Sequence, residues 1–451
     1  KRFFKYCTDH KVVGIQYLWG VIAMLAVGGG MAMMIRTNLA APGGEFITPS
    51  VYNTLVGIHG ITMIVAMIIV ATGPFGNFIM PIMIGAADMA FPRLNALSWW
   101  VLFTAIPVLC SSWFLGGVPI GWTAYAPLSV QAGPGENAYI ATIIIFAVST
   151  AIAGANITAT VVTMRAKGMS WNRVPIFVIG ATISVALAIP AFPTFMLSQI
   201  MTAMDRSFGT VFFDAHHGGS GWLYAHLFWI MGHPEVYVIL LPGVAILMEI
   251  VPVFARRPLF SYTTAVVGFA GIAGLSILVW AHHMYISGWM PMLNGPFMIT
   301  TEMISIPTGL IFLVILGTIW GGRPWLKVPM LGVFAFLWNM LIGGVTGIYL
   351  SDVPADLQLH GNMFVTAHFH YTLMGAGLTG ALGAVAFWFP KITGKYLDDL
   401  DFDKDYDTLI KNNNINKIKI SARELLLNIA KTQFESGYPY LIFIDNMNKN
   451  N

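Results

Sequence analysis

The chain has 451 residues, of which 57% are hydrophobic and only 10% are charged, and its formal net charge is +3. Soluble globular domains usually carry about 25% charged residues, so this composition excludes a soluble domain of this size and indicates a membrane protein. The two cysteines, Cys7 and Cys110, lie far apart in the sequence, which argues against a disulfide framework.

Long apolar stretches follow one another along most of the chain. A helix needs about 20 mostly apolar residues to cross the hydrocarbon core of a bilayer. The pattern therefore predicts an all-α, polytopic bundle of about ten transmembrane helices, at residues 12–34, 55–80, 95–116, 140–164, 173–200, 221–254, 261–285, 298–320, 328–350 and 363–389.

The basic residues between these stretches predict the orientation. With the N-terminus placed in the cytoplasm, fourteen Lys and Arg residues fall in inner loops, whereas only Arg36 and Arg206 fall in outer loops. Lys and Arg are enriched in cytoplasmic loops of membrane proteins. We therefore expect a cytoplasmic N-terminus, and the regular alternation agrees with the number of spans.

The composition changes near residue 397. Residues 398–451 contain nine acidic and seven basic side chains, with a predicted helix over 420–430 and a predicted strand over 438–444. We interpret 1–397 as a membrane domain and 398–451 as a small soluble α/β-like tail. The tail resembles part of the large subunit of ribonucleotide reductase, through Ala422-Arg423-Glu424-Leu425-Leu426 and Gln433-Phe434-Glu435-Ser436-Gly437, and we interpret it as an unrelated or chimeric segment.

Six histidines lie inside the apolar stretches, where ionisable side chains are rare and usually functional. Imidazole is also the commonest metal ligand in proteins. On a helix, His368 and His370 would point about 200° apart, so they could bind two different metals but not the same one. The adjacent His282 and His283 could converge on one metal if their helix is locally distorted. The six residues are His59, His233, His282, His283, His368 and His370.

These phrases resemble subunit I of the haem–copper oxidases, over about residues 10–397. The resemblance includes His233-Pro234-Glu235-Val236-Tyr237, Phe75-Gly76-Asn77, the run from Pro81 to Arg93, Gly121-Trp122-Thr123 and Ile306-Pro307-Thr308-Gly309. It implies two haems and one copper ion as cofactors.

The same resemblance assigns roles to individual residues. His59 and His370 would bind the iron of a low-spin haem, and His368 the iron of a high-spin haem. His233, His282 and His283 would bind the copper. Tyr237, which the family cross-links to His233, would complete the catalytic set with Glu235, and the residues expected at the haem edges are Arg36 and Trp122.

We also expect a path of polar side chains that carries protons. Asp88 lies in an inner loop, and Glu235 lies at membrane depth, where a carboxyl group could carry protons. Small polar side chains also pack between membrane helices without any such role, so the set as a whole carries the prediction rather than any single member. Its members are Asp88, Asn77, Asn95, Ser98, Ser149, Thr150 and Glu235, with Thr308 on a second, separate path.

The chain departs from the family pattern at three places. Ile311 stands where the family has a lysine on the second path, so that path lacks its usual proton carrier. His360 matches an outer-side metal ligand, but Gly361 replaces the aspartate beside it, which makes a magnesium site doubtful because one imidazole suits a hard ion poorly. The family's last two helices are also not found in the sequence.

These observations favour a terminal respiratory oxidase that reduces dioxygen to water and translocates protons. We expect subunit II and other oxidase subunits as partners, cytochrome c or quinol as electron donor, no nucleic acid, and a prokaryotic plasma membrane rather than a mitochondrial one. A nitric oxide reductase-like activity is an alternative that Tyr237 disfavours, and a proton-coupled transporter is another. We expect His10, His216 and His217 to be solvated loop residues, and His226 to form a local hydrogen bond.

Overall fold

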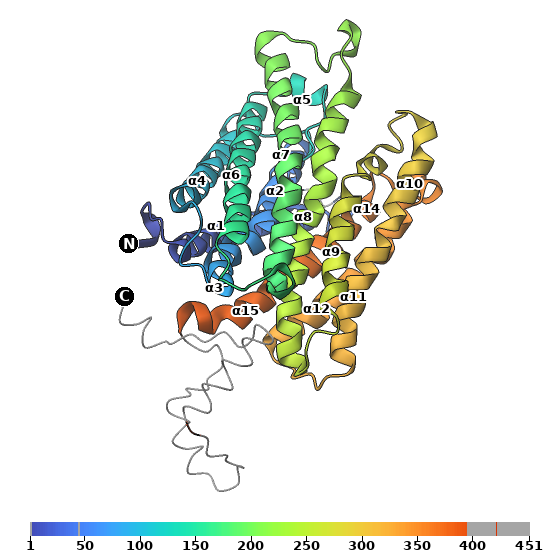
Figure 1. Ribbon diagram of the computed structural model, residues 1–451. Helices are drawn as coiled ribbons and strands as arrows, with labels where there is room; N and C mark the ends of the chain where they lie inside the picture. Colours follow the sequence, from blue (N-terminus) through green and yellow to red (C-terminus); the bar gives the residue numbers. More distant parts are fainter. Residues whose placement is uncertain (1, 44–45, 395–420, 422–451) are drawn as a thin grey trace.

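The computed structural model describes residues 2–43, 46–394 and 421, and within this part all regular structure is helical (Figure 1). Nine helical segments are long and apolar enough to cross a membrane, which confirms the predicted class. They are His10–Asn38, Pro49–Gly76, Pro92–Phe114, Gly135–Thr163, Ile176–Phe208, Gly221–Ala255, Pro291–Trp320, Val328–Ser351 and Met363–Thr393. The orientation in the membrane stays a prediction, and the helix and strand predicted in the tail lie outside the described residues.

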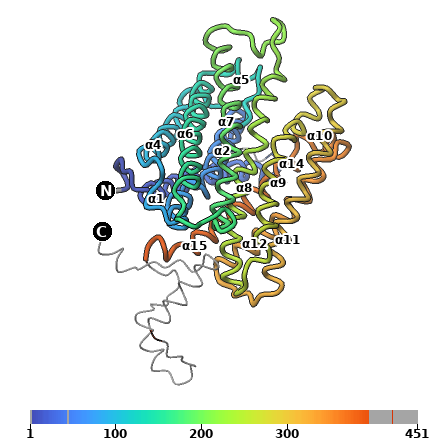
Figure 2. The backbone as a smooth tube through the Cα atoms, viewed as in Figure 1, coloured from blue at the N-terminus to red at the C-terminus, as the bar shows by residue number. Residues whose placement is uncertain are grey.

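The helices form one bundle in which sequence neighbours pack side by side (Figure 2). Its long members are α1 (His10–Asn38), α2 (Pro49–Ala71), α4 (Pro92–Phe114), α6 (Gly135–Thr163), α7 (Ile176–Phe208), α8 (Gly221–Ala255), α11 (Ser305–Trp320), α12 (Val328–Ser351) and α15 (Thr379–Thr393). Shorter helices connect them: α3 (Met80–Ile84), α5 (Leu128–Gln131), α9 (Tyr262–Ser276), α10 (Asn294–Met303), α13 (Val353–Leu359) and α14 (Met363–Phe369).

One predicted span is shorter than expected. The segment predicted at 261–285 is helical only over α9, which ends at Ser276, and a 3₁₀ helix, η5 (Trp280–Met284), follows it. The number of helices long enough to span is therefore nine rather than ten among the described residues. This break is the local distortion that two adjacent histidines need in order to face one site, because neighbours on a regular α-helix diverge by about 100°.

Two π-helical segments interrupt the long helices, one of them at a predicted ligand. They are η2 (Thr72–Gly76), which continues α2, and η7 (His370–Leu378), which joins α14 to α15. Segments of π-helix occur mostly at functional sites. In η7 the segment begins at His370 itself, so the change in helical pitch falls between the two histidines that were expected to face different metals.

The centre of the bundle is α8. Its candidate span is 78% buried, whereas that of α1 is 22% buried. Burial on all sides explains why α8 is apolar all round rather than amphipathic. Consequently His233 and Glu235, both on α8 and both less than 10% exposed, lie in the protein interior rather than against lipid.

Candidate metal centre

Three imidazoles converge where α8 meets η5. The Nε2 atom of His283 lies 3.1 Å from Nε2 of His282 and 3.3 Å from Nδ1 of His233, and the three ligand atoms all lie within 4.8 Å of one another. Nitrogens that share one ion at about 2.0–2.1 Å are about 3.3–3.5 Å apart. The donor set therefore fits a single copper ion, as the sequence predicted.

Neighbouring groups hold these rings in place. Thr301 donates its hydroxyl hydrogen to the carbonyl of Phe297, so it accepts from Nδ1 of His282 at 3.1 Å and leaves Nε2 free to bind metal. Trp229 stacks on His283 with ring centroids 3.6 Å apart and planes 8° apart. Such outer partners orient metal-binding histidines and set their tautomers, and the sequence reasoning had identified neither residue.

The ring of Tyr237 lies beside the ring of His233, with centroids 5.0 Å apart. The two residues are four apart on α8 and so share a face of the helix. The Nε2 atom of His233 is buried and has no hydrogen-bond partner in the described part of the chain. Most buried polar atoms in proteins have a hydrogen-bond partner, so the unpartnered Nε2 atom of His233 is unusual.

His59 on α2 and His370 in η7 face each other as a parallel pair. Their ring centroids are 6.4 Å apart and their planes differ by 2°. An ion held between two opposed imidazole nitrogens at about 2.0–2.1 Å from each separates the ring centres by about 6 Å, once the ring radii are added. The pair therefore fits two axial ligands of one haem iron.

His368 points away from this pair, toward α12. Its Nδ1 atom lies 2.8 Å from the carbonyl oxygen of Gly343, and a Cβ atom on Gly347 would come within 2.8 Å of the imidazole. Glycine at 347 therefore provides the room that the ring occupies. The expected divergence of His368 and His370 is found, since the two rings contact different helices.

The three histidines expected to bind haem share one hydrogen-bond pattern. In each, Nδ1 faces a backbone carbonyl: Gly28 for His59 at 2.9 Å, and Thr366 for His370 at 2.7 Å, as Gly343 does for His368. A carbonyl oxygen only accepts, so Nδ1 carries the hydrogen and Nε2 keeps a free lone pair. Every one of these rings is thus in the tautomer that binds a metal through Nε2.

The two residues expected at the haem edges differ in their surroundings. Trp122 packs on Gly60, the residue after His59, where a Cβ would come within 2.5 Å of it, and its ring meets that of Trp229 edge to face at 6.1 Å. Arg36 is exposed in the last turn of α1. The fold therefore places Trp122 between the histidine pair and the three-histidine cluster, and leaves Arg36 two turns beyond the carbonyl of Gly28.

Trp229 also bonds to the loop that carries Trp122, because its indole donates to the hydroxyl of Tyr125. Burial raises the pKa of this hydroxyl to about 12, so Tyr125 stays neutral near pH 7. The bond links the stacking partner of His283 to the loop beside the histidine pair.

The predicted residues of the Asp88 path are spread over several elements: Asn77 directly after η2, Asn95 and Ser98 on α4, Ser149 and Thr150 on α6, Glu235 on α8, and Asp88 in the loop after α3. Asp88 is half-buried in that loop and accepts from the amide of Met89 at 2.7 Å. Ser149 donates to the carbonyl of Ser98 at 2.7 Å, and Thr150 is half-buried beside it. Asn77 and Asn95 are buried, and each leaves one side-chain atom without a partner among the described residues, as Glu235 does.

Tyr17 lies against Ser98 of the predicted proton path, although it was not predicted from the sequence. Its hydroxyl lies 2.8 Å from Oγ of Ser98, and it is 2% exposed. A buried phenol on the first helix gave no sequence signal of its own, because only packing brings α1 against α4.

On the second path, Thr308 and Ile311 line a small cavity with Val244, Phe312, Ile315, Phe336 and Met340, in which Thr308 is the one polar residue.

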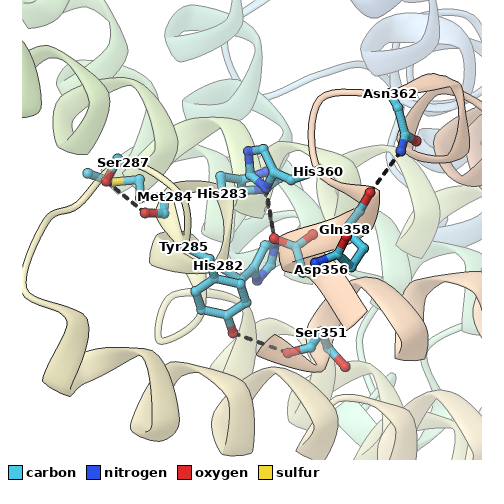
Figure 3. Close-up of polar contacts among 10 residues, drawn as sticks. All are labelled: His282, His283, Met284, Tyr285, Ser287, Ser351, Asp356, Gln358, His360 and Asn362. Atoms are coloured by element: carbon cyan, nitrogen blue, oxygen red, sulfur yellow. Dashed lines mark hydrogen bonds and ion pairs between the residues drawn. The ribbon is translucent and has the colours of Figure 1, made fainter. Parts of the chain in front are cut away.

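His360 has a partner that the sequence reasoning overlooked. Its Nδ1 atom lies 2.8 Å from Oδ2 of Asp356, which is 3% exposed (Figure 3). The pair lies beside His282 and His283 (Figure 3). The spacing of four residues on one helix could have revealed it. In the described part of the chain, only His233, His282 and His283 form a group of three or more such side chains close enough to hold one ion, so a magnesium site at His360 stays doubtful.

Among the other histidines, one prediction is wrong. His10 is the first residue of α1, only 4% exposed, and its Nδ1 atom lies 2.6 Å from the carbonyl of Asn77. Asp9 caps the helix at this point, which turns the next side chain inward. His216 and His217 are exposed as expected, and His226 accepts from the indole of Trp280 at 3.1 Å.

Several known proteins are similar to this chain over most of its length. The family model for cytochrome c and quinol oxidase polypeptide I matches residues 12–401. Cytochrome c oxidase subunit 1 of Synechocystis sp. is 38% identical over 88% of this chain, and that of Bacillus subtilis is 42% identical over 87%. A probable quinol oxidase subunit 1 of Staphylococcus haemolyticus is 39% identical over 87%. The chain spans 72%, 63% and 60% of these three relatives.

The chain therefore belongs to the family of subunit I of the haem–copper terminal oxidases, membrane oxidoreductases of respiratory electron transport whose cofactors are haem and copper. A solved heme-copper terminal oxidase dimer has the same fold, with a TM-score of 0.72 at 19% identity over 85% of this chain and 68% of that chain. The model for the ribonucleotide reductase barrel domain matches residues 379–451, which confirms the resemblance of the tail and overlaps the oxidase match.

Proposed function

We propose that this chain forms the catalytic core of an oxidase that reduces dioxygen to water, with the number and placement of cofactors inferred from its own histidines. His59 and His370 would hold a low-spin haem, His368 a high-spin haem, and His233, His282 and His283 one copper ion. When bound, the haems and copper supply the electron relay and the dioxygen-binding centre. The observation that carries this proposal is the convergence of three imidazole nitrogens, two of whose separations are 3.1 and 3.3 Å.

The residues around these ligands would prepare them for that chemistry. Backbone carbonyls keep the haem-facing imidazoles in one tautomer, and Thr301 and Trp229 hold the copper-facing rings. Tyr237 lies against His233 and can supply a proton and an electron from its phenol. The unpartnered Nε2 of His233 supports a covalent link between the two residues, as the family resemblance implies.

Protons would reach this centre along one path from Asp88 to Glu235. The unpartnered atoms of Asn77, Asn95 and Glu235 support it, because ordered water usually satisfies such buried polar groups. On the second path, the predominantly apolar lining beside Ile311 offers Thr308 no chain of polar neighbours. We infer that the Asp88 path carries protons for both water formation and translocation.

The electron donor and the surroundings of the chain belong to the same proposal. Relatives named cytochrome c oxidase and relatives named quinol oxidase match with similar identity, 38–42% and 39%, so both donors are candidates. We propose that the chain works in a prokaryotic plasma membrane with a subunit II and other oxidase subunits, since the compared relatives are bacterial.

Metal analysis of the purified protein, together with a reduced-minus-oxidised visible spectrum, tests the proposal. We expect two haems and one copper per chain, and oxygen uptake driven by either reduced cytochrome c or a quinol. Haem with non-haem iron would instead indicate a nitric oxide reductase-like centre. A folded protein that binds no haem would contradict the proposal and favour the transporter alternative.

A further inference from the structure

A second buried carboxyl group lies far along the sequence from Asp88 and Glu235. Glu136 is the second residue of α6, at the end of the bundle predicted to face outward, and it is 1% exposed. Gly135 makes this burial possible, because a Cβ there would come within 2.1 Å of the carbonyl of Gly117. Asn137, the next residue, is exposed, so Glu136 lies directly beneath the surface.

Neither carboxyl oxygen of Glu136 has a hydrogen-bond partner in the described part of the chain. Two other buried atoms, Oε1 of Gln199 and Oγ of Ser129, also lack a hydrogen-bond partner among the described residues. Four unpartnered polar atoms in one region are unusual, because nearly all such atoms in proteins are satisfied by protein or ordered water. The region therefore fits a small group of buried waters.

Arg206 does not neutralise Glu136 through a direct ion pair. Its guanidinium donates instead to the side chain of Asn137 at 2.8 Å and to four backbone carbonyls, those of Ser129, Val130, Ala132 and Gly133. These bonds hold the loop over Glu136. Because Arg206 bonds to Asn137, the residue next to Glu136, its charge lies close enough to stabilise the ionised form transiently.

Two buried tyrosines bond to the segment beside the predicted haem edge. Tyr139, one turn further along α6, donates to the carbonyl of Trp122, and Tyr224 on α8 donates to the carbonyl of Thr123 at 2.9 Å. Gln199 on α7 in turn donates to the hydroxyl of Tyr224 at 3.0 Å. Both tyrosine side chains are fully buried.

We propose that Glu136 is an outer-side proton-holding residue, which takes up a proton from the Trp122 side through Tyr139 and buried water and releases it past Arg206 to the outer surface. The proton moves from a water-bound donor to one carboxylate oxygen, and leaves the same carboxyl group for external water, so Glu136 returns to its ionised form. This role rests on the proposed oxidase function, because turnover must deliver the proton.

Infrared redox-difference spectroscopy of the purified protein, with Glu136→Gln beside the unaltered chain, tests the proposal without relying on turnover. We expect a protonated-carboxyl band that responds to the redox state, shifts in D₂O, and is lost in the variant. In sealed vesicles, proton ejection per electron should fall at least twofold in Glu136→Gln, while the haem spectrum stays unchanged. Glu136→Asp should restore part of the ejection.

Two further variants make the outcome decisive. Asp214→Asn removes a carboxyl group whose side chain is 43% exposed, at the same end of the bundle, and should change neither reading. Tyr139→Phe removes only a hydroxyl group, so it should lower ejection even if Glu136→Gln fails to fold. An unchanged band and unchanged ejection in a folded Glu136→Gln variant would overturn this inference alone, whereas absence of haem or oxygen uptake in the unaltered protein would overturn the proposed function.

Discussion

The histidine centre and the predicted proton path, although they lie in the same bundle, differ in how their polar atoms are hydrogen-bonded. Around the histidines, the ring nitrogens of His59, His282, His368 and His370 that do not face a predicted metal bond to a carbonyl or hydroxyl group. Along the path, by contrast, buried side chains such as Asn77 and Asn95 leave atoms unpaired. Metal ligands need one orientation, which saturated hydrogen bonding enforces, whereas a proton path needs free positions that water can occupy.

Replacing His283 with Ala tests the histidine side of this comparison and should have the largest effect. Loss of one of three imidazoles, together with the stacking partner of Trp229, should abolish copper binding and lower oxygen uptake by at least 100-fold. The spectrum of the low-spin haem should remain, because His59 and His370 lie on other elements. His217→Ala, at an exposed position, is the control. Retained copper with normal uptake would remove His283 from the centre.

Glu235→Gln tests the path side and should have the next largest effect. Loss of a positioned proton carrier typically costs about 10²–10⁴-fold in rate. We therefore expect turnover to fall by about 10²-fold and proton ejection to stop. Metal content should stay unchanged, unlike in the histidine variant. Glu302→Gln, on α10, is the matched control. Undiminished ejection in Glu235→Gln vesicles would exclude Glu235 from the path.

Gly347→Ala sharpens the comparison, because it changes the space around a ligand without changing the ligand. The added Cβ would come within 2.8 Å of His368, and overpacking of this kind costs about 1–3 kcal/mol. We expect partial loss of the high-spin haem signal, with the low-spin signal retained. Gly344→Ala is the control, since a Cβ there meets nothing within 4 Å. Equal haem content in the two variants would contradict the tight fit.

Removal of residues 398–451 should have the smallest effect. The residues that carry the histidine centre and the path all lie before position 394, and the oxidase family match ends at 401. We expect the same haem-to-protein ratio and the same visible spectrum as in the full chain. A marked loss of haem after truncation would show that the tail contributes to the membrane domain, contrary to the interpretation of 398–451 as an unrelated segment.

Much of the centre could be predicted from the sequence, because a polar side chain in an apolar span is itself a signal. The six histidines and Glu235 stood out for that reason, and helical geometry alone predicted that His368 and His370 would diverge. Asp356 was recoverable from its spacing to His360. The burial of His10 was not, since it depends on the contact between the start of α1 and the end of η2.

The sequence by itself predicted the class of the protein, most of its helical spans and the side chains that we propose as metal ligands, since hydrophobicity and helical period act over neighbouring residues. Only the tertiary structure decided which distant groups meet: Tyr17 with Ser98, Trp229 with His283, and Asn137 with Arg206. It also decided that the regular α-helix ends before η5, where the two adjacent histidines come to face one site. Long-range packing sets these contacts, and a linear pattern carries no record of it.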